Sequence, residues 1–149
     1  YHGTETIIFN YDYEKLSGDY PDHYLRTAVV FFDPQVKLPE FYLKPQSLGS
    51  RIFKRKDIDF EEDPYFSKRY YLTGPDRKAV RDVFAIPQRQ ALIESKNRWA
   101  VGSAEGYVVI YADEKMDEQI KPSANEMGAY LEQTWSLYDV LSSSMRMSR

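Results

Sequence analysis

The sequence predicts an α+β fold, in which a mostly antiparallel sheet of about five to seven strands carries about three helices on one face. Three observations lead to this prediction. The first third of the chain consists of alternating or short apolar segments separated by turn residues, which is typical of strands. Residues 75–95 and the segment from residue 123 onwards carry apolar residues three and four apart, which is typical of helices. A hairpin pattern at residues 98–112 lies between these two helical segments.

The composition fits one soluble folded domain over residues 1–149. Hydrophobic residues make up 42% of the chain and charged residues 29%, whereas disordered chains are poorer in apolar residues. Tyrosine is frequent, with 13 residues against 8 phenylalanines. Because tyrosine can bury its ring and keep its hydroxyl in water, this favours a sheet with one partly exposed face. An aromatic-rich binding surface stays open as the alternative.

Charge and cysteine content argue against several classes of function. The net charge of −3 argues against sequence-independent nucleic-acid binding, which needs a surplus of Lys and Arg. The chain has no cysteine, so it has no disulfide, catalytic thiolate or Cys-ligated zinc. The longest apolar runs, such as AVVFF at residues 28–32, are far shorter than the ~18–20 residues that span a bilayer. The chain begins with Tyr1 rather than Met, and we expect it to be a piece of a longer protein.

Three strands are expected in the first third of the chain. Residues 5–13 alternate between apolar and polar side chains, and residues 16–22 form the turn that follows. Residues 24–32 become apolar on both faces toward their end and predict a central strand. Residues 40–44 form a short strand between two prolines, which suits an edge strand or a strand end. Three aromatic residues of the first strand share one face: Phe9, Tyr11 and Tyr13.

Residues 46–56 form a basic segment without a clear periodicity. Four cations surround Ile52 and Phe53, and we call them the basic patch: Arg51, Lys54, Arg55 and Lys56. We interpret this segment as a solvated connection. The alternative is a small amphipathic surface that binds anionic lipid headgroups, which makes the basic patch the candidate binding site.

An acidic run follows, with Asp57, Asp59, Glu61, Glu62 and Asp63. Such carboxylates could bind a hard cation such as Ca²⁺, which takes ~6–8 oxygen ligands, or serve as the acid pair of a glycosidase. Ile58 and Phe60 alternate with the acidic residues as in a half-buried strand, and no glycine supplies the bend of a cation loop. We therefore predict a structural edge strand that ends at Pro64, and no metal site.

The next segment predicts a strand at residues 69–73 followed by two short helices. Thr73 or Gly74 caps the first helix, with Pro75 at its first position, where a missing N–H costs nothing. Pro87 starts the second helix, residues 87–95, because proline interrupts a continuous helix.

The last third predicts a hairpin and a long helix. The two strands of the hairpin are residues 98–104 and 107–112, with Glu105 and Gly106 in the turn between them. Ser123 and Glu126 form a capping box that starts a helix of about 20 residues. Its single apolar stripe predicts that this helix covers the sheet.

No catalytic constellation is evident. The only histidines are His2 at the terminus and His23 in the expected turn region, where neither is held as a base. Glycine-rich phosphate loops and the HExxH motif do not occur. We therefore name no catalytic residue and expect no cofactor.

Four separated segments resemble, in order, an uncharacterised bacterial family. They are LPEFYLKP at 38–45, DIDF at 57–60, PYFSKRYYLTG at 64–74, and AVRDVF followed two residues later by proline at 79–87. In that family the soluble domain follows one or two N-terminal membrane-spanning helices. The resemblance implies a membrane-attached parent protein with its membrane part upstream of Tyr1, and we expect the soluble domain in the cytoplasm. It carries no catalytic motif that could be transferred to this chain.

We therefore predict a non-enzymatic interaction module on the soluble side of a bacterial membrane protein, with a protein or the membrane surface as its partner. A lipid-headgroup-binding domain that uses the basic patch is the first alternative. A hydrolase that uses the acidic run at residues 57–63 is the second. The sequence does not indicate an oligomeric state.

Overall fold

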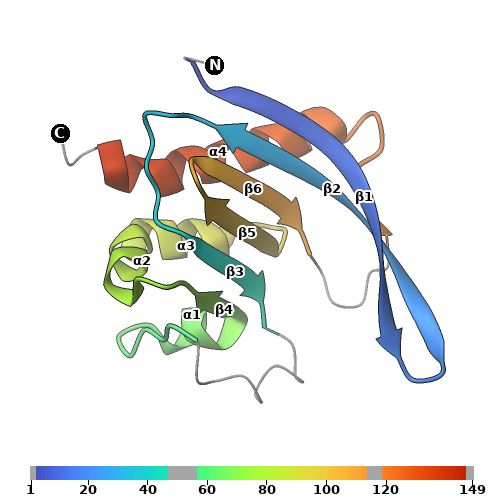
Figure 1. The fold of residues 1–149 in the computed structure, drawn as a ribbon, viewed down its shortest axis with the longest axis horizontal. Helices are drawn as coiled ribbons and strands as arrows, with labels where there is room; N and C mark the ends of the chain where they lie inside the picture. Colours follow the sequence, from blue (N-terminus) through green and yellow to red (C-terminus); the bar gives the residue numbers. More distant parts are fainter. Residues whose placement is uncertain (1–2, 47–56, 114–118, 147–149) are drawn as a thin grey trace.

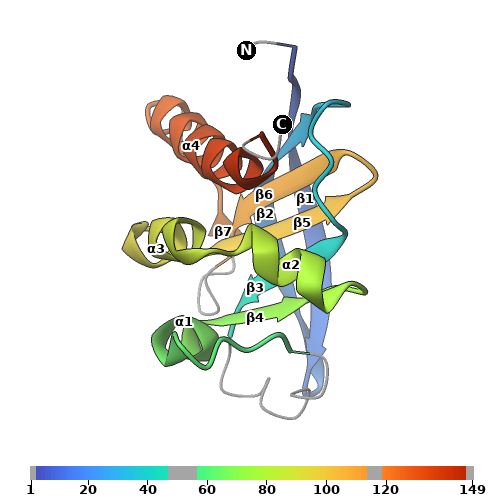
Figure 2. The same cartoon turned by 90° about the vertical axis from the view of Figure 1, so that its left-hand side faces the viewer.

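The computed structural model describes residues 3–46, 57–113 and 119–146 and confirms the α+β fold (Figure 1). The strands are β1 (Glu5–Ser17), β2 (Tyr20–Phe32), β3 (Phe41–Pro45), β4 (Tyr70–Thr73), β5 (Trp99–Ala104), β6 (Tyr107–Ala112) and β7 (Gln119–Ile120). The helices are α1 (Pro64–Arg69), α2 (Arg77–Val83), α3 (Ile86–Glu94) and α4 (Met127–Arg146). Seen along the sheet, α3 and α4 lie on one side of it (Figure 2).

The sheet has the strand order β1-β2-β6-β5-β3-β4, and every neighbouring pair in this order is antiparallel. The short β7 pairs with β2 in parallel, beyond the end of the β2–β6 ladder. Consecutive hairpins supply β1–β2 and β5–β6. The sequence predicts the second as a hairpin and, for the first, a turn between the two strands. The central position of β2 is confirmed as well.

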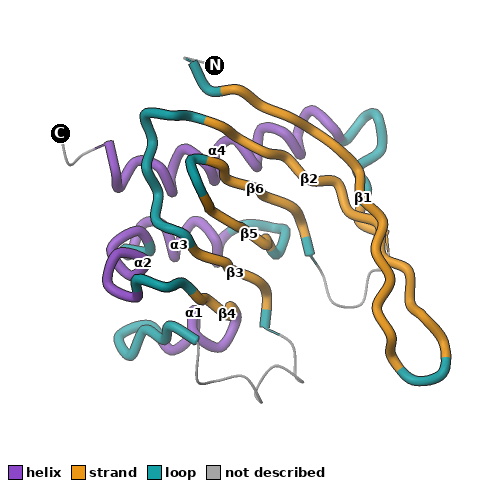
Figure 3. The backbone as a smooth tube through the Cα atoms, in the orientation of Figure 1, coloured by secondary structure: helices purple, strands orange, loops and turns teal. Residues whose placement is uncertain are grey.

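The first hairpin is longer than the sequence predicts, because β1 and β2 both extend into the expected turn at residues 16–22. Leu16 pairs with Pro21 and Ser17 with Tyr20, so that only two residues form the turn. Gly18 has a φ of +76°, which glycine adopts without a steric cost and which the tightest hairpin turns require. The result is a hairpin arm that extends well beyond the other strands (Figure 3).

The short strand β3 lies inside the sheet, between β5 and β4, so the edge interpretation of its two prolines is wrong. The strand-end interpretation is right. Pro39 lies two residues before Phe41, the first residue of β3, and Pro45 is the last residue of the strand. Neither proline therefore removes a donor from the middle of the ladder.

The acidic segment forms no strand, which corrects the predicted edge strand at residues 57–63. Ile58 and Phe60 are buried, as their alternation predicts, but Asp57 is buried as well. Its carboxylate accepts a 3.0 Å hydrogen bond from the Leu72 N–H, and the Ile58 N–H donates a 2.7 Å bond to the Leu72 carbonyl oxygen. One side chain and one backbone group thus cover the edge of β4 in place of a regular ladder.

Two helix starts differ from the prediction. Pro64 begins α1 instead of ending a strand, and the Asp63 carboxylate caps this helix by accepting a 3.1 Å bond from the Phe66 N–H. Asp76, rather than Thr73 or Gly74, caps α2 through a 3.0 Å bond from the Ala79 N–H. In both helices an aspartate side chain accepts a hydrogen bond from a free N–H group of the first turn, and this cap sets the start of the helix.

The long helix begins as predicted, because the Glu126 carboxylate accepts a 2.9 Å bond from the Ser123 N–H. Its buried stripe packs on β2, where the rings of Phe31 and Tyr138 stack with centroids 4.6 Å apart. The core lies between the sheet and the helices. It includes Val29, Leu43, Leu72, Val83, Phe84, Leu92, Trp99, Val101, Ile110 and Leu141.

Candidate binding surface

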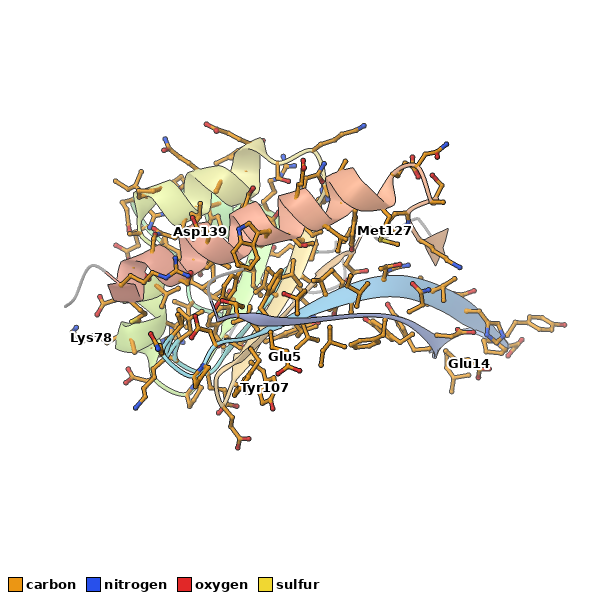
Figure 4. The ribbon with its side chains drawn as sticks, turned by 90° about the horizontal axis from the view of Figure 1, so that it is seen from above. Glu5, Glu14, Lys78, Tyr107, Met127 and Asp139 are labelled. Atoms are coloured by element: carbon orange, nitrogen blue, oxygen red, sulfur yellow. The ribbon has the colours of Figure 1, made fainter. Side chains whose placement is uncertain are left out.

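The face of the sheet opposite the helices carries a set of aromatic side chains. Side chains alternate along a strand, and directly paired residues of neighbouring strands share a face. Val29 and Ile110 are paired and belong to the helix-covered core, so their neighbours Ala28 and Tyr111 lie on the other face. Figure 4 shows Tyr107 pointing away from α4 on this second face. We call the following set the tyrosine face: Phe9, Tyr11, Tyr13, Tyr24, Phe32, Tyr42, Tyr71, Tyr107 and Tyr111.

The aromatic rings contact one another across several strands. Tyr13 stacks on Tyr24 with centroids 5.2 Å apart and on Tyr11 at 5.6 Å. Tyr11 meets Tyr111 edge to face at 5.8 Å. The Tyr111 and Tyr42 hydroxyl oxygens lie 2.9 Å apart in a hydrogen bond. The tyrosine face is therefore a connected surface that runs from β1 to β3.

Two hydroxyl groups of this surface are weaker acids than an ordinary tyrosine. Burial raises the pKa of Tyr13 to about 12. Burial, followed by the hydrogen bond with Tyr42, raises the pKa of Tyr111 well above the ordinary tyrosine value. These phenols keep their protons at neutral pH, so they offer rings and neutral hydrogen-bonding groups to a partner.

A hollow of about 710 Å³ lies on this face between Tyr42 and Tyr107, which are 39% and 48% exposed. Gly102 forms part of its floor, and a Cβ atom added there would lie 3.1 Å from a Val109 methyl group. The residues that bring charge to its lining are Glu40 and Arg77. The hollow thus has aromatic walls, an apolar floor and one charge of each sign.

A buried ion pair lies beneath the part of this face that β2 forms, next to Tyr11 and Tyr24. Arg26 is 1% exposed, and its guanidinium donates bonds of 3.0 and 3.1 Å to one carboxylate oxygen of Asp113. The guanidinium also lies 5.4 Å from the centre of the Tyr24 ring. This arrangement fixes Tyr24 by a cation–π contact and neutralises the cation beneath the aromatic surface.

The site residues predicted from the sequence do not form this surface. The basic patch of Arg51, Lys54, Arg55 and Lys56 lies outside the described residues. The acidic residues point in different directions. Asp63 caps α1 and accepts a 2.9 Å bond from Arg89, whereas Asp57 turns toward β4, where burial raises the pKa of its carboxyl group. Within the described ranges, no three acidic or histidine side chains gather where a metal ion could bind.

The tyrosine face was only partly visible in the sequence. The alternation that places Phe9, Tyr11 and Tyr13 on one face is confirmed, and the tyrosine content favours a partly exposed sheet. Tyr42 and Tyr107 come from distant strands, and their proximity to one hollow depends on the strand order. In the sequence YVVIY of β6, the two tyrosines are four positions apart and therefore share one face of the strand. This spacing was the signal that could have placed Tyr107 and Tyr111 on the same side of the sheet.

No protein-family model, curated protein or solved structure matches this chain. Among the helices of the described ranges, none is both long and apolar enough to cross a membrane.

Proposed function

We propose that this chain is a non-enzymatic interaction module that binds a protein partner through the tyrosine face. The observation that carries the proposal is the pair of exposed rings, Tyr42 and Tyr107, on the two sides of the hollow over Gly102. Tyrosine is enriched among the residues that dominate protein interfaces, because it contributes a large rigid ring and a polar group together. An extended segment with an aliphatic or aromatic anchor side chain fits the apolar floor.

The charges favour a protein partner over a polyanion. Arg26 is neutralised by Asp113, and Glu40 accompanies Arg77 at the hollow. A surface that binds nucleic acid or anionic lipid needs clustered unpaired cations. The resemblance to a membrane-attached bacterial family supports the further proposal that the module lies on the soluble side of a membrane protein.

The test is a selection of peptides from a displayed random library against the chain, followed by affinity measurements on purified variants. We expect selected peptides to carry an apolar anchor. Tyr107→Ser should weaken their binding by about tenfold, as expected when a central interface aromatic is lost. Gly102→Val should weaken it as well, because the added methyl groups fill the hollow.

Tyr65→Ser is the matched control, because Tyr65 is 58% exposed on α1 and lies off the tyrosine face. Selected peptides that bind all three variants equally would rule out the tyrosine face as the binding surface. Turnover of a defined substrate, abolished by one substitution, would overturn the non-enzymatic part of the proposal.

The lipid alternative is distinguished by co-sedimentation with vesicles that contain anionic phospholipid. Binding that survives Tyr107→Ser and disappears when Arg51, Lys54, Arg55 and Lys56 are all replaced by Ala would favour the headgroup-binding domain. We expect no such binding.

A further inference from the structure

The two edges of the sheet differ in how they are covered. At the β4 edge, Asp57 and Ile58 both bond to Leu72 and occupy its free backbone groups. At the other edge, β1 is 13 residues long and pairs only with β2, and no other described segment hydrogen-bonds to its outer side (Figures 1 and 3). Alternate residues of β1 therefore present N–H and C=O groups along this edge that no strand of the described ranges pairs with.

The outer edge of β1 lacks the features that usually prevent pairing with another chain. Natural edge strands are short, bulged, or carry lysine or proline. Residues 6–11 contain no charged residue and no proline, and the register with β2 continues without a bulge. Three consecutive apolar side chains, Ile7, Ile8 and Phe9, are 49%, 44% and 43% exposed.

Both faces of β1 are apolar at this place. Ile7 and Phe9 lie on the tyrosine face. Ile8 lies on the helix side, where it lines a groove of about 460 Å³ together with Leu131 and Trp135 of α4. Because α4 leaves this groove open, a strand added beside β1 would gain apolar contacts on both of its faces.

We propose that β1 pairs antiparallel with β1 of a second copy of this chain, with Ile8 on the two-fold axis. In this register Ile7 lies opposite Phe9 of the partner copy, and Ile8 lies opposite its own counterpart. With the two-fold axis at any other residue of β1, at least one of the three exposed apolar residues would lie opposite a polar residue. Only an axis at Ile8 pairs all three with apolar residues.

The polar residues also fit self-pairing. Thr6 lies opposite Asn10 and Glu5 opposite Tyr11, so no two carboxylates meet across the axis. The two copies form one continuous sheet, with the helices of both on the same side and the two tyrosine faces joined on the other. The interface is isologous, as is usual for homodimers.

The test measures the association of the chain by sedimentation velocity over a range of concentrations. We expect a monomer–dimer equilibrium, and we expect Ile8→Lys to raise the dissociation constant by about tenfold or more, because two like charges then meet on the axis. Leu16→Lys is the matched control, since Leu16 is an 82% exposed apolar residue of the same strand outside the paired segment. It should leave the equilibrium unchanged.

The absence of native cysteine permits a second test that does not depend on the stability of Ile8→Lys. Directly opposed residues of antiparallel strands have Cα atoms about 4.5–5.5 Å apart, which is within the range of a disulfide. Ile8→Cys should therefore form a covalent dimer under mild oxidation, and Leu16→Cys should not. A mixture of Ile7→Cys and Phe9→Cys should form mainly the mixed dimer.

Each result decides the proposal. A chain that stays monomeric at all concentrations, or a dimer that Ile8→Lys and Leu16→Lys weaken equally, overturns it. Equal disulfide formation at positions 8 and 16 overturns the register.

Discussion

The Tyr130 hydroxyl donates a 2.7 Å hydrogen bond to the Thr27 carbonyl oxygen, across 103 positions of the sequence. The same hydroxyl accepts a 2.9 Å bond from the Ala112 N–H. The β2–β6 ladder ends at the pair Ala28 and Tyr111, so Thr27 and Ala112 would form its next rung. Tyr130 is inserted there, at the point where β7 replaces β6 as the neighbour of β2. One side chain of α4 thus satisfies the backbone groups at a fork in the sheet.

Tyr130→Phe should lower the free energy of unfolding by about 1–3 kcal/mol, because it leaves a buried N–H and a buried carbonyl oxygen without a partner. Urea denaturation followed by circular dichroism measures the change. Tyr65→Phe is the control, since the Tyr65 hydroxyl makes an exposed bond with Arg69. Equal unfolding free energies for the two variants would contradict the bridging role of Tyr130.

Stability should fall as the pH rises from 10 to 12. Burial raises the pKa of Tyr130 from 10.0 to about 12, so in this window the unfolded chain loses a proton that the folded chain keeps. Each pKa unit corresponds to about 1.4 kcal/mol. Tyr130→Phe removes this contribution, and the stability difference between the wild type and the variant should therefore shrink between pH 10 and pH 12. Urea titrations at both pH values measure it, and a constant difference would argue against the raised pKa.

Removal of Asp113 should destabilise the chain strongly. Arg26 is 1% exposed, and Asp113→Ala leaves its buried cation without the carboxylate. We expect a loss of about 3 kcal/mol in unfolding free energy, at the lower end of the range for buried pairs because the Asp113 side chain is 25% exposed.

The surface pair of Lys78 and Asp82 is the control for this experiment, since both side chains are largely exposed. Asp82→Ala should cause no measurable loss, because solvent screens such pairs. An Asp113→Ala variant as stable as Asp82→Ala would show that the Arg26 cation reaches water.

Two glycines should respond in opposite directions to alanine. A Cβ atom at Gly74 would lie 2.7 Å from the Glu40 carbonyl oxygen and 2.7 Å from a Val80 methyl group, so Gly74→Ala should cost about 1–3 kcal/mol. Gly128 lies in α4 with nothing within 4 Å of the added atom. Gly128→Ala should stabilise the chain by up to about 1 kcal/mol. Thermal unfolding of both variants tests the contrast, and a destabilised Gly128→Ala would refute it.

Local patterns predicted those elements whose signals are short-range. The alternation in β1, the two-residue turn of β5–β6 and the Ser123–Glu126 cap depend on neighbours in the sequence, and the structure confirms each of them. The acidic run shows where such reasoning fails. Asp57 is buried because Leu72, fifteen residues away, donates to its carboxylate, and no local pattern encodes that contact.

The sequence by itself determined the α+β class, the separation of strands from helices and the shared face of Phe9, Tyr11 and Tyr13 in the first strand, because side-chain periodicity and turn residues act over a few positions. The tertiary structure decided the strand order, which brings Tyr42 and Tyr107 to one hollow, and it decided which sheet edge is covered. Those features depend on contacts between residues far apart in the chain. These contacts are stabilised by the packing of side chains from different strands and helices, which the sequence of one segment alone does not specify.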